Sequence, residues 1–264
     1  MLSDDRRPGT GLGRTRRAVS SVSLAALLAL VPLTACSSDS ESSTSPDSGA
    51  ATTPAGSAGS EQSSETAAYF YPPVEGATLT YRNSLDIGEF TTEVTVNSVT
   101  SGADGQTIVA TEVSTGDETV TVERTLRIAP DGSLHLSITP GLTYAFGPWL
   151  GLTYEGDDIV IPSLADLEAG RTSSGTFVEI EEDGERGDIA YTVRGAGREQ
   201  VTVPAGTAEA YVVEIDLTFT MDNETVSRTG RYWLVPGFGQ VRQEIGSSLG
   251  DITIELVSSS VPLP

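Results

Sequence analysis

Residues 211–221 read Tyr-Val-Val-Glu-Ile-Asp-Leu-Thr-Phe-Thr-Met, and this stretch decides the fold. From Val213 onward, apolar residues stand at every odd position and polar residues at every even one. A period of two places all the apolar side chains on one face of an extended chain. The stretch therefore predicts a long β-strand with one buried face.

The same alternation recurs from Tyr69 onward. It is clearest in Thr119–Ile128, where Val120, Val122, Leu126 and Ile128 share one side. Shorter runs are centred on residues 134–138, 189–193 and 252–256, and the segments between runs are short and rich in Gly, Asp and Asn, as in Pro130-Asp131-Gly132. Spacers this short cannot hold a crossover helix, so neighbouring strands should be antiparallel. We expect about ten strands in a meander.

One segment favours a helix. Ser163-Leu164-Ala165-Asp166-Leu167-Glu168-Ala169-Gly170 has an N-capping serine and a glycine at its end, and it is two turns long at most. The predicted fold is therefore all-β, an antiparallel meander with one short helix. A sandwich or a closed barrel would also fit, but long strands with a single apolar face favour a strongly curved sheet or partly open barrel.

The first 35 residues have the layout of an export signal. Five arginines between Arg6 and Arg17 precede an uncharged apolar stretch, Ala18–Ala35, and Leu33-Thr34-Ala35-Cys36 follows the pattern of a lipobox. We predict a lipoprotein signal peptide over residues 1–35, with Cys36 as the lipid-carrying residue that anchors the protein to the extracytoplasmic face of the cell membrane. A membrane-spanning helix and a plain secreted protein are the alternatives.

The segment 36–68 is predicted to be a disordered tether. After Cys36 it contains no Val, Ile, Leu, Met, Phe, Trp or Tyr, so it cannot bury enough apolar surface to offset its ordering entropy. Period-two alternation begins only after it. Residues 69–264 are therefore assigned to one β-rich extracytoplasmic domain.

The charge excludes one class of partner. Residues 36–264 hold 10 Arg and 35 Asp plus Glu, a net charge of −25. Such a surface repels phosphate backbones, so we predict no nucleic-acid partner. The sole cysteine is assigned to the lipid, which leaves none for a disulfide.

A binding site is predicted around an irregular aromatic segment. Residues 140–154 are broken by Gly and Pro and hold five large side chains, Tyr144, Phe146, Trp149, Leu150 and Tyr154. Such side chains can line the mouth of a β cavity or plug one end of the core. A cavity of ~300–1,000 Å³ behind them would favour ligand carriage, and a filled core would favour a scaffold. Arg124 joins this site as a candidate, because it occupies the apolar register of its strand, where an inward arginine needs a carboxylate partner. The alternative is that Arg124 marks the rim at the end of its strand.

Signatures of catalysis are weak. The only histidine, His135, lies between two leucines and should face the polar side of its strand, and no Gly-x-Ser-x-Gly motif is present. We predict no catalytic residue, no cofactor and no metal site. The acidic run 181–188 fits no EF-hand loop and is interpreted as a solvated hairpin tip. A hydrolase that uses two of the many carboxylates is the alternative.

Three motifs resemble those of a known group of proteins. Residues 71–82 resemble its opening "YPL-x-x-G-x-x-W-x-Y", Val203-Pro204-Ala205-Gly206-Thr207 resembles its "VPAGTF" turn, and Tyr232–Val241 resembles its "YW-x-APGVGLV" segment. Leu79 and Ala208 depart from the usual Trp and Phe. The group is a loose set of bacterial lipoproteins of unknown function that includes DUF3108-like and TapB-like proteins. The resemblance implies an antiparallel β domain on a lipid anchor and no catalytic residues.

The function predicted from the sequence is a non-enzymatic, membrane-anchored lipoprotein. It would bind an apolar or glycan ligand, or serve as a scaffold for another envelope protein.

Overall fold

The computed structural model describes residues 67–85, 88–116, 119–138, 153–180, 184–221, 224–247 and 250–264. Cys36 and most of the tether therefore lie outside the described residues. Two residues that the sequence analysis assigns to the tether, Ala67 and Ala68, are buried in the folded domain.

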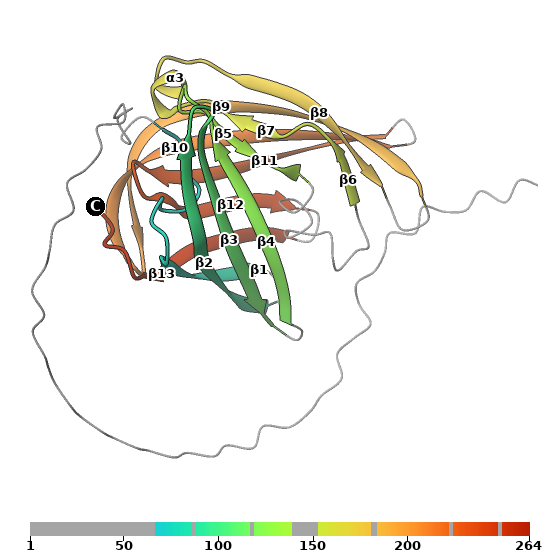
Figure 1. Ribbon diagram of the computed structural model, residues 1–264. Coiled ribbons are helices and arrows are strands. Elements are labelled where there is room, and N and C mark those ends of the chain that lie inside the picture. Colours follow the sequence, from blue (N-terminus) through green and yellow to red (C-terminus); the bar gives the residue numbers. More distant parts are fainter. Residues whose placement is uncertain are drawn as a thin grey trace, which may run out of the picture. The chain divides into compact units, whose positions relative to one another are not determined.

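The described residues form one antiparallel sheet of thirteen strands (Figure 1). The strands are β1 (Thr78–Leu85), β2 (Gly88–Gly102), β3 (Gly105–Thr115), β4 (Thr119–Ile128), β5 (Leu134–Leu136), β6 (Thr153–Gly156), β7 (Ile159–Ile161), β8 (Ser173–Ile180), β9 (Arg186–Val203), β10 (Gly206–Met221), β11 (Glu224–Val235), β12 (Gly239–Ser247) and β13 (Gly250–Ser259). Their order is β6-β8-β9-β10-β11-β12-β13-β1-β2-β3-β4-β5-β7. The predicted all-β meander is confirmed, with β1 and β13, the first and last strands, paired near its middle.

The alternating stretches form the strands that they predict. Thr119–Ile128 is β4 without change, and residues 211–221 form most of β10. The count of about ten strands was too low. Strands β6 and β7 have only four and three residues, which is too short for an alternating pattern to be recognised.

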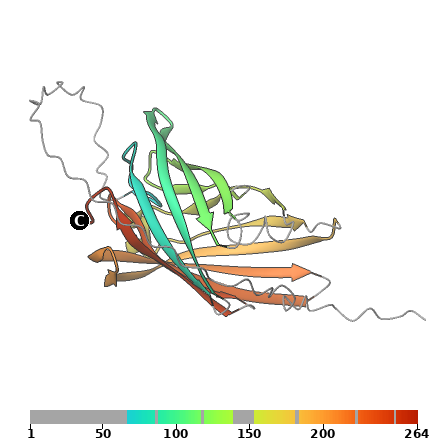
Figure 2. The same cartoon turned by 90° about the horizontal axis from the view of Figure 1, so that it is seen from below.

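The sheet curves strongly, so that β2–β4 lie over β10–β12 (Figure 2). The buried side chains of its inner face form one hydrophobic core. Its inner face carries the apolar register of each strand, for example Val94, Ile108, Leu126 and Val213, all of which are buried. We call the end with the β2–β3, β4–β5, β9–β10 and β11–β12 turns the closed end. The end where β1–β2, β3–β4, β8–β9, β10–β11 and β12–β13 are joined is the open end.

The two edges of the sheet are joined by consecutive residues. Strands β6 and β7 are separated only by Asp157 and Asp158, and β6 pairs with β8 while β7 pairs with β5. No backbone ladder joins β7 to β8 in the described chain. Instead, the Tyr191 hydroxyl donates to the Asp158 carbonyl at 3.2 Å, and the Ser173 hydroxyl donates to the Val160 carbonyl. The sheet is therefore open at its backbone and bridged by side chains along this seam.

The predicted helix is present as α3, Leu164–Glu168. The Ser163 hydroxyl caps its first turn by accepting the Asp166 amide at 3.2 Å, and Gly170 follows its end with φ +77°. Leu164 and Leu167 are buried, so the helix packs its apolar side against the sheet.

Candidate site on the inner face of the sheet

A buried ion pair lies on the inner face between β3 and β4. Arg124 binds Glu112 through Nε to Oε1 and through Nη2 to Oε2, the latter at 3.1 Å. Glu112 is 1 % exposed and Arg124 7 %. Arg124 therefore points inward, as its register predicted, and Glu112 supplies the carboxylate that an inward arginine needs.

The segment Ala67–Tyr71 fills the closed end above this pair. The Tyr71 hydroxyl donates to Glu112 Oε1, and burial raises the pKa of that phenol well above its usual range. Phe70 lies 6.0 Å from the Arg124 guanidinium and 6.2 Å from the Tyr232 ring. The Ala68 amide donates to Gly132 at 3.0 Å, and the Gln240 amide donates to Phe70 at 3.1 Å. We call Ala67–Tyr71 the plug, because its aromatic side chains close this end of the core.

Further buried polar side chains lie on neighbouring strands, and together with Glu112 and Arg124 we call them the polar layer. Asn83 donates to the Thr92 hydroxyl at 2.9 Å, and Thr92 bonds to Ser114 at 2.7 Å. Gln240 donates to Gln243 at 3.2 Å, and all five residues are buried. None of them was predicted as a site residue. The signal was available, because Glu112 and Ser114 continue the buried register of Ile108 and Ala110, just as Arg124 continues that of Leu126.

Toward the open end the same face is apolar and partly exposed. Leu217 and Phe219 on β10 are half-buried, and Val226, opposite Phe219 on β11, is 50 % exposed. The Arg228 guanidinium stands 5.4 Å from the Phe219 ring centroid, within the range of a cation–π contact. Phe90 on β2 and Ile254 on β13 extend this half-buried apolar surface. We call Phe90, Leu217, Phe219, Val226 and Ile254 the open-end face.

The structure positions only part of the predicted aromatic site. Tyr144, Phe146, Trp149 and Leu150 lie outside the described residues. Tyr154 is buried on β6 with its ring 6.0 Å from the Phe177 ring, and burial raises the pKa of its phenol. Tyr154 and Arg124 lie on strands that are ten places apart in the sheet order.

His135 belongs to a polar cluster that superficially resembles a catalytic triad. Its Nε2 lies 3.4 Å from the Ser133 hydroxyl, and its Nδ1 lies 3.9 Å from Asp158. However, the Arg127 guanidinium, which can only donate, is 3.0 Å from Nδ1 and so places the ring proton on Nε2. Nε2 then donates to Ser133, whose hydroxyl donates to Asp131 at 2.7 Å. A serine nucleophile needs the opposite tautomer, so this serine is held as a structural residue of the turn.

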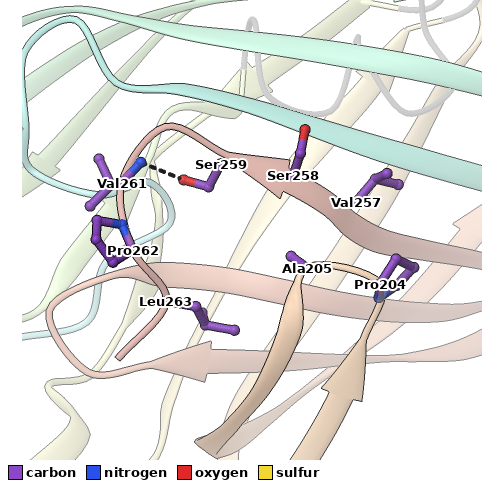
Figure 3. A pocket seen from close by; sticks show the side chains of 8 residues that line it. All are labelled: Pro204, Ala205, Val257, Ser258, Ser259, Val261, Pro262 and Leu263. Atoms are coloured by element: carbon purple, nitrogen blue, oxygen red, sulfur yellow. Dashed lines mark hydrogen bonds between the residues drawn. The ribbon is translucent and has the colours of Figure 1, made fainter.

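A pocket of about 330 Å³ lies at the closed end, away from the open-end face. It is formed by the β9–β10 turn, the end of β13 and the C-terminal residues, including Pro204, Ala205, Val257 and Leu263 (Figure 3). Among the described residues, no group of three or more His, Cys, Asp or Glu side chains is arranged to hold a metal ion. The described part of the chain also holds no helix long and apolar enough to cross a membrane.

The fold and the site define a class of protein. It is an antiparallel, curved β domain whose core is divided by a buried polar layer and whose closed end is filled by the segment that precedes β1. Residues 75–250, two thirds of the chain, match the DUF3108-like family. The chain belongs to the DUF3108-like family. A comparison with curated proteins finds no match.

Two solved structures share this fold. One is a protein from Bacteroides fragilis described as exported, with a YmcC-like fold; it has 19% identity and a TM-score of 0.56, over 74% of this chain and 100% of that one. The other is a protein from Parabacteroides distasonis described as a lipoprotein, with 18% identity and a TM-score of 0.57 over 74% of this chain and 99% of that one.

Proposed function

We propose that this protein is a lipid-anchored extracytoplasmic adaptor that holds another envelope protein on its open-end face. The anchor is Cys36, which ends a lipobox behind a basic and then apolar leader. Two proteins of the same fold are described as exported or as a lipoprotein, which supports this location.

The observation that carries the adaptor role is the contrast between the two ends of the inner face. At the closed end the described side chains fill the interior, with the plug packed on Arg124, Glu112 and Tyr232. At the open end apolar side chains stay partly exposed, up to 50 % at Val226. An apolar face that stays partly exposed, beside an end packed by aromatic side chains, suits contact with another protein.

A non-enzymatic role follows from the same chemistry. The buried carboxylate of Glu112 is bound by Arg124 through both of its oxygens. The His135 ring carries its proton on Nε2, which faces Ser133, so it cannot accept the proton of a nucleophilic serine. We therefore assign these groups to structure.

Site-specific photo-crosslinking in the native host tests the proposal. A photoreactive amino acid in place of Val226 should give a discrete protein adduct, whereas the same amino acid in place of Val74 should not. Val74 is 46 % exposed, nearly the same as Val226, but precedes β1 at the closed end. Equal adducts from both positions, or none from position 226, would contradict the adaptor role. A lipid that co-purifies with the chain in a one-to-one ratio would favour a carrier instead.

A further inference from the structure

We infer that the segment held on the open-end face is a basic, amphipathic stretch of the partner protein. This inference rests on the proposed adaptor function and adds the chemistry of the partner. Its basis is the pattern of apolar and acidic side chains around the open end.

The apolar half of the pattern is the open-end face itself. Phe219 and Val226 lie opposite each other on β10 and β11, and Ile254 lies on β13 between Gln243 and Asn83. These side chains continue the core outward but are only half-buried or exposed. A partner must therefore bring an apolar strip of its own to cover them.

The acidic half is the rim of the same end. Glu89 on β2, Asp188 on β9 and Asp251 on β13 are exposed beside the hairpin connections, and Glu185 precedes β9. Arg186 lies at this rim and is already paired with Glu155 at 2.7 Å. A basic partner gains attraction from the rim, whereas an acidic partner or an anionic lipid surface is repelled.

Arg228 shows how a cation fits this surface. Its guanidinium stands over the Phe219 ring at 5.4 Å, within the apolar face. Arginine is suited to such a place, because its planar, weakly hydrated head packs on aromatic rings. Arginine side chains of the partner can extend this pattern along the face toward the carboxylates.

Three synthetic peptides test the inference against the exported chain carrying Cys36→Ser. The first is a Leu/Arg peptide of about 14 residues, roughly four helical turns, with one apolar and one basic face. The second has Glu in place of Arg, and the third has Ser in place of Leu. The Leu/Arg peptide should bind at least about tenfold more tightly than either of the others at low salt, because it alone supplies both charge and apolar surface.

Matched variants locate the binding. Val226→Ser should weaken binding of the Leu/Arg peptide about three- to tenfold, and its exposed counterpart Val74→Ser should change it less than about twofold. Glu89→Lys should weaken it by about three- to tenfold, whereas Glu75→Lys, with the same change in net charge at the closed end, should have a smaller effect. Asp251→Lys repeats the rim test on another strand, and circular dichroism verifies that each variant is folded.

Equal binding of the Leu/Glu peptide, equal losses in the Glu75 and Glu89 variants, or no binding of the Leu/Arg peptide would overturn the inference. The adaptor function is judged separately by crosslinking from position 226. An adduct there without charge-dependent peptide binding would leave the adaptor role intact and reject only the basic partner segment.

Discussion

At the scale of single residues, polar groups in the buried register organise the interior. Glu112 and Arg124 each interrupt an apolar row, and each would be costly to bury alone. Together they form a two-bond contact, to which Tyr71 adds a third donor. Tyr81 and Tyr232 also lie in this interior, and burial raises the pKa of Tyr232 to about 12. The phenols therefore stay protonated, and those of Tyr71 and Tyr81 donate hydrogen bonds to Glu112 and to the Gln240 carbonyl.

Removal of one member of the ion pair should destabilise the fold strongly. We expect Arg124→Met to lower the free energy of unfolding by about 3–5 kcal/mol, because Glu112 is then left buried without its countercharge. The double variant Arg124→Met with Glu112→Met should recover part of this loss, since no charge remains buried. Urea denaturation of the Cys36→Ser chain measures both. A loss below about 1 kcal/mol in Arg124→Met would show that the pair is not buried in solution.

The His135 cluster should make stability depend on pH. Burial and the neighbouring Arg127 lower the pKa of His135 in the folded state, although Asp158 and Asp131 oppose this shift. As the pH falls, the unfolded chain therefore binds the His135 proton before the folded chain does. The contribution of neutral His135 to folding stability is complete above about pH 6.5 and is lost as the pH falls toward the pKa of the folded state. The hydrogen bonds from Ser133 lower the pKa of Asp131, so its contribution is lost only at more acidic pH.

We expect His135→Gln to flatten the decrease of Tm between about pH 7 and 5, where the histidine titrates, while the loss below about pH 4 remains. Thermal unfolding followed by circular dichroism at a series of pH values measures this. If His135→Gln and the unmodified chain lose stability in parallel from pH 7 to 5, the histidine does not control this range.

At the scale of elements, the plug is the segment whose position most needs explanation. It forms no strand, yet Ala67–Tyr71 is buried and makes backbone hydrogen bonds to Gly132 and Gln240. Gly239 makes this approach possible. Its φ is +121°, and a Cβ at that position would lie 2.7 Å from the carbonyl carbon and oxygen of Phe70. A glycine at the start of β12 is thus required by the plug as well as by the turn.

Gly239→Ala should displace the plug. We expect a loss of stability larger than the ~1–2 kcal/mol of backbone strain expected for Gly237→Ala, together with faster amide hydrogen exchange at residues 67–71. Gly237 is the matched control, because its φ is +69° and a Cβ added there would meet no atom within 4 Å. Exchange followed by mass spectrometry distinguishes the two. Unchanged exchange at the plug in Gly239→Ala would contradict this close packing.

At the scale of the whole molecule, the plug is the first described segment of the domain and follows the proposed anchor and tether in the sequence. The tether that follows Cys36 leads directly into Ala67, whose neighbour Ala68 is fully buried. The open end is at the opposite end of the inner face. An adaptor tied to the membrane through its closed end would therefore be free to present its open end to a partner.

The anchor has a direct test in the native host. We expect the protein to stay with the membrane fraction after a high-salt wash and Cys36→Ser to appear in the soluble extracytoplasmic fraction, since acyl chains and not charge hold it there. Mass spectrometry of the mature N-terminus should find an acylated Cys36. Release of the unmodified protein by salt alone, or cleavage at another residue, would reject the lipid anchor.

Local patterns were sufficient for the longer strands, their buried faces, the capped helix and the antiparallel meander. A strand shows its buried face in every second residue, and a helix shows its ends in its capping residues, so neither depends on distant parts of the chain. The same local rule marked Arg124 as inward but could not identify Glu112 as its partner. That pairing depends on the register of β3 against β4. The pattern of either strand alone does not specify this register.

The amino-acid sequence by itself determined that the chain is a β meander with a lipobox and an acidic surface. Only the tertiary structure decided that Ala67–Tyr71 plugs the closed end, that β6 and β7 meet the two edges of one sheet, and that apolar side chains stay exposed at the open end. Such contacts join residues distant in the chain. They follow from how far the whole sheet curves, which no single stretch of residues encodes.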